Sequence, residues 1–193
     1  MRSPAKRQRR PHPIEPGPQL ASATLPSPVG PLTLVAGTTG LVAVLWENEK
    51  PGRVPLDGTP GSETVPVLQM AKRQLTEYFN GKRQGFDLPC TATGTPFQTK
   101  VWKALSAIPY GSTRTYAQIA RQIGRPRAVR AVGAAIGRNP LSILVPCHRV
   151  IGSNGKLTGF AGGLPRKEIL LELERSGKSS APSTGSIGPR NTT

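Results

Sequence analysis

The sequence has few residues that could bind a metal ion or form disulfides. Its 193 residues include two cysteines, Cys90 and Cys147, and two histidines, His12 and His148. A structural zinc site usually takes four nitrogen or sulfur ligands, and disulfide-rich secreted domains contain many more cysteines. We therefore expect no metal site and no disulfide framework. The scarcity of cysteine favours a reducing, intracellular setting.

Long apolar runs are also lacking. No stretch approaches the roughly 20 consecutive apolar residues that a membrane-spanning helix needs. The basic N-terminus is not followed by an apolar core, so it is not predicted to be a secretory signal. These two absences favour a cytoplasmic protein that has no membrane partner.

Acidic residues are missing from one half of the chain. The formal net charge is +16 at pH 7, and the sequence pI is about 11.1. Residues 97–176 contain thirteen basic and three acidic residues, whereas residues 21–96 contain six of each. No carboxylate occurs between Asp87 and Glu168. Charge runs are often only solvated surfaces, but so long an acid-free stretch favours binding to a phosphate backbone.

Composition divides the chain into five parts. Residues 1–20, rich in Pro and Arg, and residues 177–193, rich in Ser, Gly and Pro, are predicted to be flexible tails. Between them we expect an N-terminal α/β domain over residues 21–90, a linker over 91–96 and a mainly helical domain over 97–176. The first tail fits either added nucleic-acid affinity or a plain solvated segment.

The N-terminal domain shows secondary-structure patterns but no visible chemistry. Residues 32–36 and 41–46 predict two strands around a glycine-bounded turn. Apolar residues at helical spacing predict a helix over residues 65–79, which ends at Asn-Gly. A short apolar segment, residues 86–88, is expected to be another strand. Cys90 follows it as a structural or incidental thiol.

The C-terminal domain contains a helix-turn-helix pattern. An apolar stripe from Phe97 to Ile108 predicts the first helix of this domain. Thr115 is expected to cap a helix over residues 116–123, and a Gly-Arg-Pro turn separates it from a helix over residues 127–136. The latter has small residues between its arginines, which suit close approach to a partner or tight helix packing. These small residues are Ala128, Ala131, Gly133, Ala134 and Ala135.

A candidate nucleophile follows a buried apolar segment. Residues 141–145 and Pro146 lead into Cys147, and the cationic neighbours His148 and Arg149 favour a thiolate. Residues 167–175 are predicted to form a helix whose carboxylates could orient the imidazole. Adjacent side chains in an extended segment point apart, so we expect a water molecule between the histidine and the sulfur. A lone cysteine beside a histidine is nevertheless more often coincidental than catalytic.

These motifs resemble those of the O6-alkylguanine-DNA alkyltransferase family. The motif PCHRV is preceded by GRNPLSILV and followed by IGSNGKLTGFAGGLPRKEILLELE. The resemblance covers about residues 24–176, is strongest over 97–174, and includes PFQTKVWKALSAIPYGSTRTYAQIA. It implies an α+β fold, in which a small ribonuclease-H-like α/β domain precedes a mainly helical domain with the helix-turn-helix.

The resemblance implies catalytic roles for several residues. Cys147 matches the alkyl acceptor, and His148 matches the base that activates it through water. Glu174 matches the glutamate that holds the histidine, although Glu172 is a nearby competitor. Asn139 matches the asparagine that orders the active-site turn.

Further residues match the family's DNA and substrate contacts. Tyr116 matches the tyrosine that crowds the phosphate 3′ of the target and hydrogen-bonds the flipped base. Arg130 matches the arginine that replaces the extruded nucleotide in the duplex. The other DNA contacts are expected at Thr115, Arg127, Ala128, Ala131 and Gly133. The guanine pocket is expected at Val150, Gly159, Phe160, Ala161 and Gly162. At Phe160 and Ala161 the chain departs from relatives that have a hydroxyl there, and its N-terminal domain lacks the zinc-binding set of some members.

The implied function is direct reversal of DNA damage. A monomer would flip an O6-alkylguanine out of double-stranded DNA from the minor groove and transfer the alkyl group irreversibly to Cys147, with no cofactor. In a bacterium it would be cytoplasmic and associated with the nucleoid. Activity on O4-alkylthymine and the range of alkyl groups stay open.

Three other functions are weighed against this one. A non-catalytic lesion-binding protein would share the architecture, but known relatives of that kind lack the cysteine. A cysteine hydrolase is disfavoured because the sequence resembles no such family and an arginine-rich helix-turn-helix has no purpose there. A regulator fused to a repair protein is disfavoured because no separate second DNA-binding domain is visible.

Overall fold

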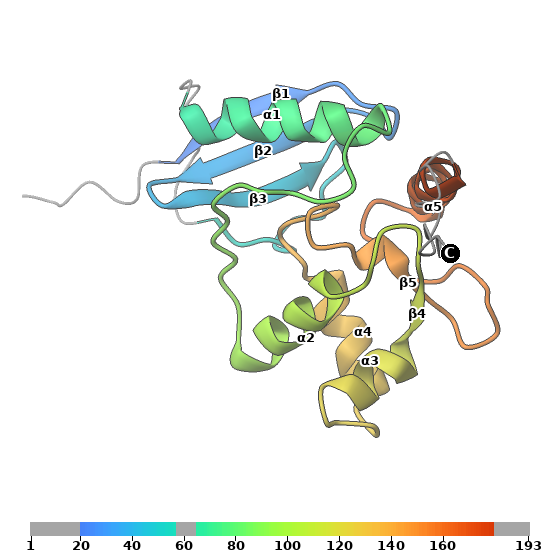
Figure 1. The fold of residues 1–193 in the computed structure, drawn as a ribbon. Helices are drawn as coiled ribbons and strands as arrows, with labels where there is room; N and C mark the ends of the chain where they lie inside the picture. The colour runs from blue at the N-terminus through green and yellow to red at the C-terminus, as the bar shows by residue number, and fades with distance from the viewer. Residues whose placement is uncertain (1–19, 57–64, 180–193) are drawn as a thin grey trace, which may run out of the picture.

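The fold consists of an α/β unit packed on a helical unit, as Figure 1 shows. The structure, a computed structural model, describes residues 20–56 and 65–179. The predicted tails lie almost entirely outside these residues, as does His12. The strands and α1 form the upper unit of Figure 1, whereas α2, α3 and α4 form the lower one. The mixed α+β class expected from the sequence is confirmed.

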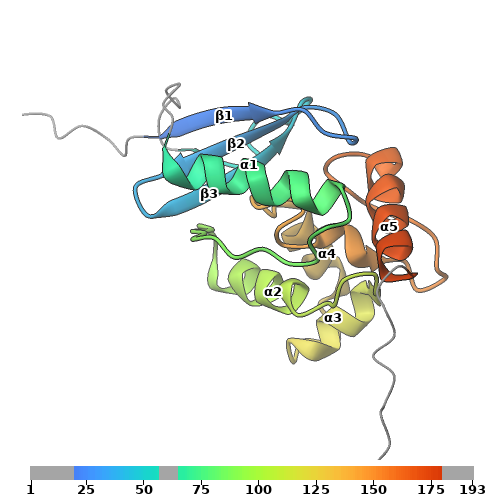
Figure 2. The same cartoon turned by 45° about the horizontal axis from the view of Figure 1, so that its top comes forward.

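The upper unit is a three-stranded antiparallel sheet covered by one helix. The strands β1 (Ala21–Leu25), β2 (Leu32–Gly37) and β3 (Gly40–Trp46) lie in the order β1-β2-β3. Figure 2 shows α1 (Pro66–Phe79) lying along the sheet. The two predicted strands and the predicted helix are confirmed. The edge strand β1 was not predicted, because its sequence ASATL has only one large apolar residue.

The strand predicted over residues 86–88 is wrong. The side-chain amide of Gln74 in α1 donates to the Asp87 carbonyl (2.6 Å), and the Asp87 amide donates back to the Gln74 side chain (2.8 Å). These two bonds tie the segment to the helix and leave it no ladder partners. Pairing with β3 begins only afterwards, where the Leu41 amide donates to the Pro89 carbonyl at 2.9 Å.

The lower unit contains the predicted helix-turn-helix. Thr115 accepts a hydrogen bond from the Gln118 amide, and the Gln118 side chain accepts one from the Thr115 amide, so a capping box starts α3 as expected. The last helix of the pattern begins two residues later than predicted. The Ala128 amide still closes the preceding turn onto the Arg125 carbonyl (2.9 Å). The elements are α2 (Pro96–Ser106), β4 (Arg114–Thr115), α3 (Tyr116–Gln122) and α4 (Val129–Gly137).

Three more elements follow in the described part of the chain, up to residue 179. They are the 3-10 helix η1 (Cys147–Arg149), β5 (Val150–Ile151), which pairs with β4 in parallel, and α5 (Leu164–Ser179). The helix α5 continues to Ser179, so a flexible tail starting at residue 177 is wrong for its first three residues. The other predicted domain limits stay predictions.

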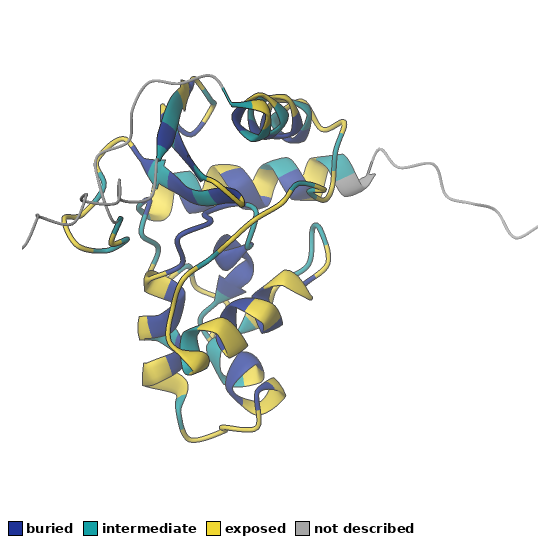
Figure 3. Cartoon of the chain, turned by 90° about the vertical axis from the view of Figure 1, so that its left-hand side faces the viewer, coloured by how far each residue is buried: buried dark blue, intermediate teal, exposed yellow. Residues whose placement is uncertain are grey.

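The segment before η1 lies between the two cores. Leu141 and Ile143 pack into the core of the sheet and α1, whereas Cys147 and Val150 pack into the core of the lower helices. The Val44 amide of β3 also donates to the Pro140 carbonyl at 2.9 Å. Figure 3 shows how the helices bury their inner sides and expose the outer ones. Among the described residues, no helix is long and apolar enough to cross a membrane.

Candidate active site

The candidate nucleophile lies on a tight turn at the junction of the two units. Cys147 opens η1 directly after Pro146, and only 4% of its surface is exposed. Its amide donates to the Val145 carbonyl (2.7 Å), and the Arg149 amide donates to the Pro146 carbonyl (3.0 Å). The extended conformation expected at Cys147 and His148 is therefore wrong. Both residues instead lie in a 3-10 turn.

The backbone just before this turn is strained. Ile143 has φ of 74°, a left-handed conformation that costs a β-branched residue about 1–3 kcal/mol. Asn139 closes the same segment, because its side chain donates to the Val145 carbonyl (2.8 Å) and accepts from the Leu141 amide (3.0 Å). Asn139 thus holds the turn that presents Cys147.

A buried histidine and carboxylate lie next to the cysteine. Nε2 of His148 is 2.8 Å from Oε1 of Glu174, and neither side chain is exposed. Within the described part of the chain, Nδ1 of His148 has no hydrogen-bond partner. Burial, the largest influence, lowers the pKa of His148 together with the charges of Arg149 and Lys167, although Glu174 acts to raise it. The imidazole is therefore neutral at pH 7, with its proton on Nε2 and its lone pair on Nδ1.

Glu174 is the centre of a dense hydrogen-bond network. Arg149 donates to both of its oxygens (2.8 and 2.9 Å), the Tyr78 hydroxyl donates to Oε1 (2.7 Å), and the Gly111 amide donates to Oε2 (3.0 Å). Burial alone would raise the pKa of Glu174, but the bonds from His148 and Arg149 outweigh it and lower the pKa to about 2.

The competing carboxylate lies elsewhere. Glu172 is 61% exposed and pairs with Arg175 on the surface of α5 at 2.6 Å. The helix turns it away from the histidine, since positions two residues apart do not share a face. Of the two glutamates considered from the sequence, the fold brings only Glu174 to His148.

The charges around the thiol differ from those expected. Burial is the largest influence on the pKa of Cys147 and raises it. A hydrogen bond from Asn139 and the positive charges of Arg53 and Lys167 lower it in part. Arg149 was expected to favour the thiolate, but its side chain is turned to Glu174 and to the Ile108 carbonyl (2.5 Å). The cations that act on the sulfur thus come from outside the motif.

Arg53 is one residue that sequence reasoning missed. Its guanidinium pairs with Glu49 and donates to the carbonyl of Asn139 at 2.6 Å, so the upper unit binds the residue that holds the segment before Cys147. The side chain is 7% exposed. No local signal could have found it, because Arg53 stands in a Pro- and Gly-containing loop that predicts only surface.

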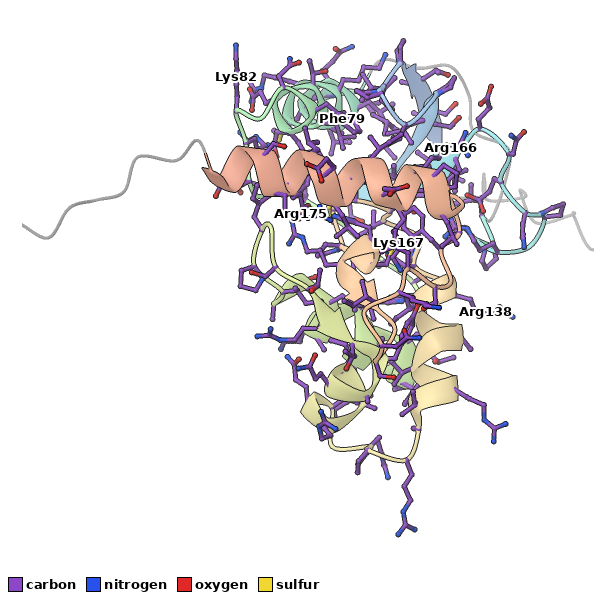
Figure 4. All side chains as sticks on the ribbon, turned by 90° about the vertical axis from the view of Figure 1, so that its right-hand side faces the viewer. Phe79, Lys82, Arg138, Arg166, Lys167 and Arg175 are labelled. Atoms are coloured by element: carbon purple, nitrogen blue, oxygen red, sulfur yellow. The ribbon has the colours of Figure 1, made fainter. Side chains whose placement is uncertain are left out.

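Lys167 is the other missed residue. It is fully buried, and its ammonium donates to the carbonyls of Val150 (2.5 Å) and Thr158 (2.7 Å). Burial lowers the pKa of Lys167 to about 8. Figure 4 shows its position on the side of α5 that faces the lower unit, where its two bonds join the loop after β5 to Val150 of β5. The signal available in the sequence was the position of Lys167 on the side of the predicted helix that faces inward.

A cavity of about 490 Å3 opens beside this loop. The Tyr116 hydroxyl donates toward the carbonyls of Thr158 (3.1 Å) and Gly159 (3.2 Å) at its wall. Burial and the nearby Cys147 raise the pKa of Tyr116, against a lowering by Thr158. The lining residues are Lys50, Arg53, Tyr116, Gly133, Gly137, Thr158, Gly159, Phe160 and Ala161.

Two of the residues expected in the pocket, Val150 and Gly162, do not line this cavity. Val150 is fully buried and contributes its carbonyl to Lys167. A Cβ at Gly162 would lie 2.7 Å from the Trp46 ring, so this glycine lets the loop pack on the sheet. Trp46 also meets Phe160 edge to face, with ring centroids 5.3 Å apart.

The helix α4 presents a small and basic outer face. Arg130, Ala131 and Ala134 are exposed, whereas Ala135 is buried, and its carbonyl accepts from the Trp102 indole (2.9 Å). Both interpretations of the small residues therefore apply: the exposed ones are available to a partner surface, and the buried one serves helix packing. Figure 4 shows Arg138 projecting outward just after α4. Of the remaining expected DNA contacts, Arg127 is exposed, and Thr115, Ala128 and Gly133 are half-buried.

No candidate metal site accompanies this arrangement. Among residues 20–56 and 65–179, no three His, Cys, Asp or Glu side chains are grouped closely enough to hold an ion.

Two family models match the chain. The DNA binding domain of 6-O-methylguanine DNA methyltransferase matches residues 96–176, and the ribonuclease-like domain of the same proteins matches residues 20–92. The chain belongs to the 6-O-methylguanine DNA methyltransferase family. The resemblance and the enzyme class expected from the sequence are confirmed.

Curated members of this methyltransferase family match over most of their length. The methylated-DNA–protein-cysteine methyltransferase of Methanosarcina barkeri is 51% identical over 151 residues, which are 78% of this chain and 94% of that one. The Mycobacterium tuberculosis protein of the same name is 50% identical over 155 residues, which are 79% and 91% of the two chains.

Solved structures of the methyltransferase family share the fold. The crystal structure of Mycobacterium tuberculosis O6-methylguanine methyltransferase matches with a TM-score of 0.73 and 47% identity, and it covers 86% of this chain and 96% of that one. A second structure of the Mycobacterium tuberculosis protein, in complex with DNA, matches with a TM-score of 0.71, also at 47% identity, over 82% and 94% of the two chains.

Proposed function

We propose that the protein repairs DNA by transferring the alkyl group of O6-alkylguanine to its own Cys147 in one irreversible turnover. The observation that carries this proposal is the buried His148–Glu174 pair beside a buried cysteine. Membership of a family of methylated-DNA–protein-cysteine methyltransferases supports it, as does the related Mycobacterium tuberculosis structure in complex with DNA.

The His148–Glu174 pair supports activation of the thiol through water. Glu174 holds the proton on Nε2 of His148, so the lone pair of Nδ1 is available as a base. A water molecule at Nδ1 would accept the proton of the Cys147 thiol and pass its own to the imidazole. The imidazolium that forms is stabilised by the ionised Glu174.

The transfer itself is a single displacement. The thiolate of Cys147 attacks the alkyl carbon, the new S–C bond forms as the C–O6 bond breaks, and the electron pair passes to the guanine. The Tyr116 hydroxyl at the cavity wall donates a proton to the leaving base. The thioether product has no route back, so each molecule reacts once and no cofactor takes part.

The outer face of α4 supports extrusion of the base. O6 of a stacked guanine is not accessible to a buried thiol, so the nucleotide must leave the helix at a cost of a few kcal/mol. Exposed small residues, Ala131 and Ala134, allow α4 to approach the minor groove, and Arg130 would occupy the gap in the duplex. The remaining basic residues of the lower unit would contact phosphates.

One chain supplies the whole proposed site. The relay, the cavity and the outer face of α4 all come from residues of the same molecule, so we propose that a monomer acts on one lesion. Phe160, which lines the cavity, is held by its edge-to-face contact with Trp46. Bulky groups would have to displace this ring.

Mass spectrometry of the intact protein tests the proposal directly. After mixing with a duplex that contains O6-methylguanine, we expect one added methyl per molecule, mapped to Cys147, and unmodified guanine in the DNA. Cys147→Ser should abolish the mass gain and retain DNA binding. Cys90→Ser is the matched control, because this other thiol is exposed and should be dispensable. Tight lesion binding by the wild type without a mass change would instead indicate a non-catalytic lesion-binding protein.

A further inference from the structure

Tyr78 brings the upper unit into direct contact with the proposed relay. It lies in the last turn of α1, 96 residues before Glu174 in the chain, and no part of its side chain is exposed. Its hydroxyl donates to Oε1 of Glu174 at 2.7 Å. The same oxygen is 2.8 Å from Nε2 of His148. The tyrosine and the histidine therefore share one acceptor atom.

An acceptor atom that is shared by several donors binds each of them less strongly. Oε1 receives bonds from Tyr78, His148 and Arg149, whereas Oε2 receives bonds from Arg149 and the Gly111 amide. Each donor on Oε1 draws negative charge toward itself and leaves less to stabilise a proton on the imidazole. The hydroxyl of Tyr78 thus acts on the proton affinity of His148 without touching it.

The hydroxyl of Tyr78 is fixed as a permanent donor. Its ring packs against Phe79, Phe86 and Tyr110, with centroid distances of 5.4, 5.5 and 6.1 Å, which hold the hydroxyl toward α5. Burial raises the pKa of Tyr78 far above its ordinary value, and the charge of Glu174 raises it further. The phenol therefore keeps its proton at neutral pH and donates it to Glu174.

We propose that Tyr78 is a positioning residue for alkyl transfer, whose hydroxyl limits the basicity of His148 by sharing Oε1 of Glu174. This inference rests on the proposed function, since His148 matters here as the base of the relay. It also assigns the α/β unit a part in the chemistry, because α1 then supplies one donor to the carboxylate on α5.

The other ionisable groups around His148 and Glu174 come from elements other than α1. Arg149 and Cys147 come from η1, Lys167 and Glu174 from α5, and Tyr110 from the loop before β4. The charges of Arg149 and Lys167 lower the pKa of His148, whereas Glu174 raises it. Loss of the hydrogen bond from Tyr78 to Glu174 should therefore raise the pKa of His148.

The test is the pH dependence of single-turnover transfer by Tyr78→Phe. At a saturating concentration of duplex that contains O6-methylguanine, the measured rate does not depend on DNA binding. The relay needs neutral His148, so the rate falls as pH drops through the pKa of this residue. We expect the acidic midpoint to move upward by about 0.5–1 pH unit in the variant. An unchanged midpoint, or a rate reduced equally at all pH values, would mean that the hydroxyl has only a structural role and would overturn the proposal.

Tyr110→Phe is the matched control. Tyr110 belongs to the same aromatic cluster, but its hydroxyl faces the Leu173 carbonyl at 3.4 Å and not the carboxylate of Glu174. Its removal should leave the acidic midpoint where it is in the wild type. An equal shift in both variants would overturn the specific role of Tyr78.

A second substitution gives the opposite sign and preserves the ring. Replacement of Tyr78 by 3,5-difluorotyrosine makes the phenol a stronger donor, so the acidic midpoint should move downward. This variant tests the proposal even if Tyr78→Phe folds poorly. A shift in the same direction as that of Tyr78→Phe would contradict the sharing of Oε1.

The titration of His148 by NMR separates this proposal from the proposed function. The sequence contains only two histidines, His12 and His148, so His148→Gln assigns the signals. The pKa of His148 should rise in Tyr78→Phe whether or not the protein transfers alkyl groups. Absence of methyl transfer in the wild type would remove the proposed function. Normal methyl transfer by the wild type, together with an unchanged pKa of His148 in Tyr78→Phe, would contradict only the proposed role of Tyr78.

Discussion

Glu174→Gln is the substitution whose effect on stability can be worked out furthest. Glutamine keeps the shape of the side chain but removes the charge that Arg149 meets with two hydrogen bonds. Removal of one partner of a buried ion pair typically costs about 3–5 kcal/mol, because the other charge stays buried. A chain of this size loses about 2–4 °C of Tm per kcal/mol, so Tm should fall by about 6–20 °C.

The pH dependence of unfolding supplies an independent magnitude. The pKa of Glu174 is about 2 in the folded protein, against an ordinary value of 4.5. A lowered pKa means that the stabilisation is complete above pH 4.5 and is lost as pH falls toward 2. The difference corresponds to about 3 kcal/mol. The stability curves of wild type and Glu174→Gln should therefore converge below pH 4.5 and lie parallel above it.

Urea denaturation followed by circular dichroism measures both quantities. Glu172→Gln is the control, because this exposed residue on the same helix pairs with Arg175 at the surface and should change stability by less than about 1 kcal/mol. A cost of Glu174→Gln no greater than that of Glu172→Gln would contradict a stabilising ion pair between Glu174 and Arg149. A flat wild-type stability between pH 4.5 and 2 would refute it as well.

Three further substitutions test other parts of the structure. Arg130→Ala should slow transfer from duplex DNA far more than reaction with the free base O6-benzylguanine, since this exposed side chain does not line the cavity; equal losses would contradict its role in extrusion. Arg53→Met should lower the unfolding free energy by about 2–4 kcal/mol and slow methyl transfer, because Asn139, whose side chain holds the segment before Cys147, loses a 2.6 Å bond. Unchanged kinetics would disprove this role of Arg53. Gly40→Ala should lower Tm strongly, because its Cβ would lie 2.5 Å from the Pro89 carbonyl oxygen. Gly52→Ala is the control: its Cβ would have no atom within 4 Å, so the free energy of unfolding should fall by only about 1 kcal/mol.

Local patterns were enough to predict most of the secondary structure. The strands β2 and β3, the helix α1 and the capped helix α3 follow from alternation, helical spacing and the Thr115 cap, all of which act within a few residues. The errors occur where contacts between residues far apart in the sequence determine the local structure. The Gln74 side chain binds the backbone of Asp87 and prevents a strand there, and β1 forms because a neighbouring strand pairs with it.

The motif around Cys147 was likewise sufficient to indicate the chemistry. The sequence predicted a cysteine, a histidine and a carboxylate in one site, and it named Glu174 and Glu172 as the candidates. Helix phase then decides between them, because α5 buries Glu174 and exposes Glu172. The prediction that Arg149 favours the thiolate failed for a related reason, since the turn at η1 directs its guanidinium to Glu174.

Residue type and short spacing were enough to predict β2, β3, α1 and α3, the basic half of the chain, and Cys147 as the candidate nucleophile. Only the tertiary structure brought in Arg53, Tyr78 and Lys167, which act on the turn, on Glu174 and on the pocket loop. Tyr78 and Arg53 belong to the other unit of the fold. Burial gives these contacts their strength, because a hydrogen bond or charge acts far more strongly away from water, and burial arises only when the two units pack together.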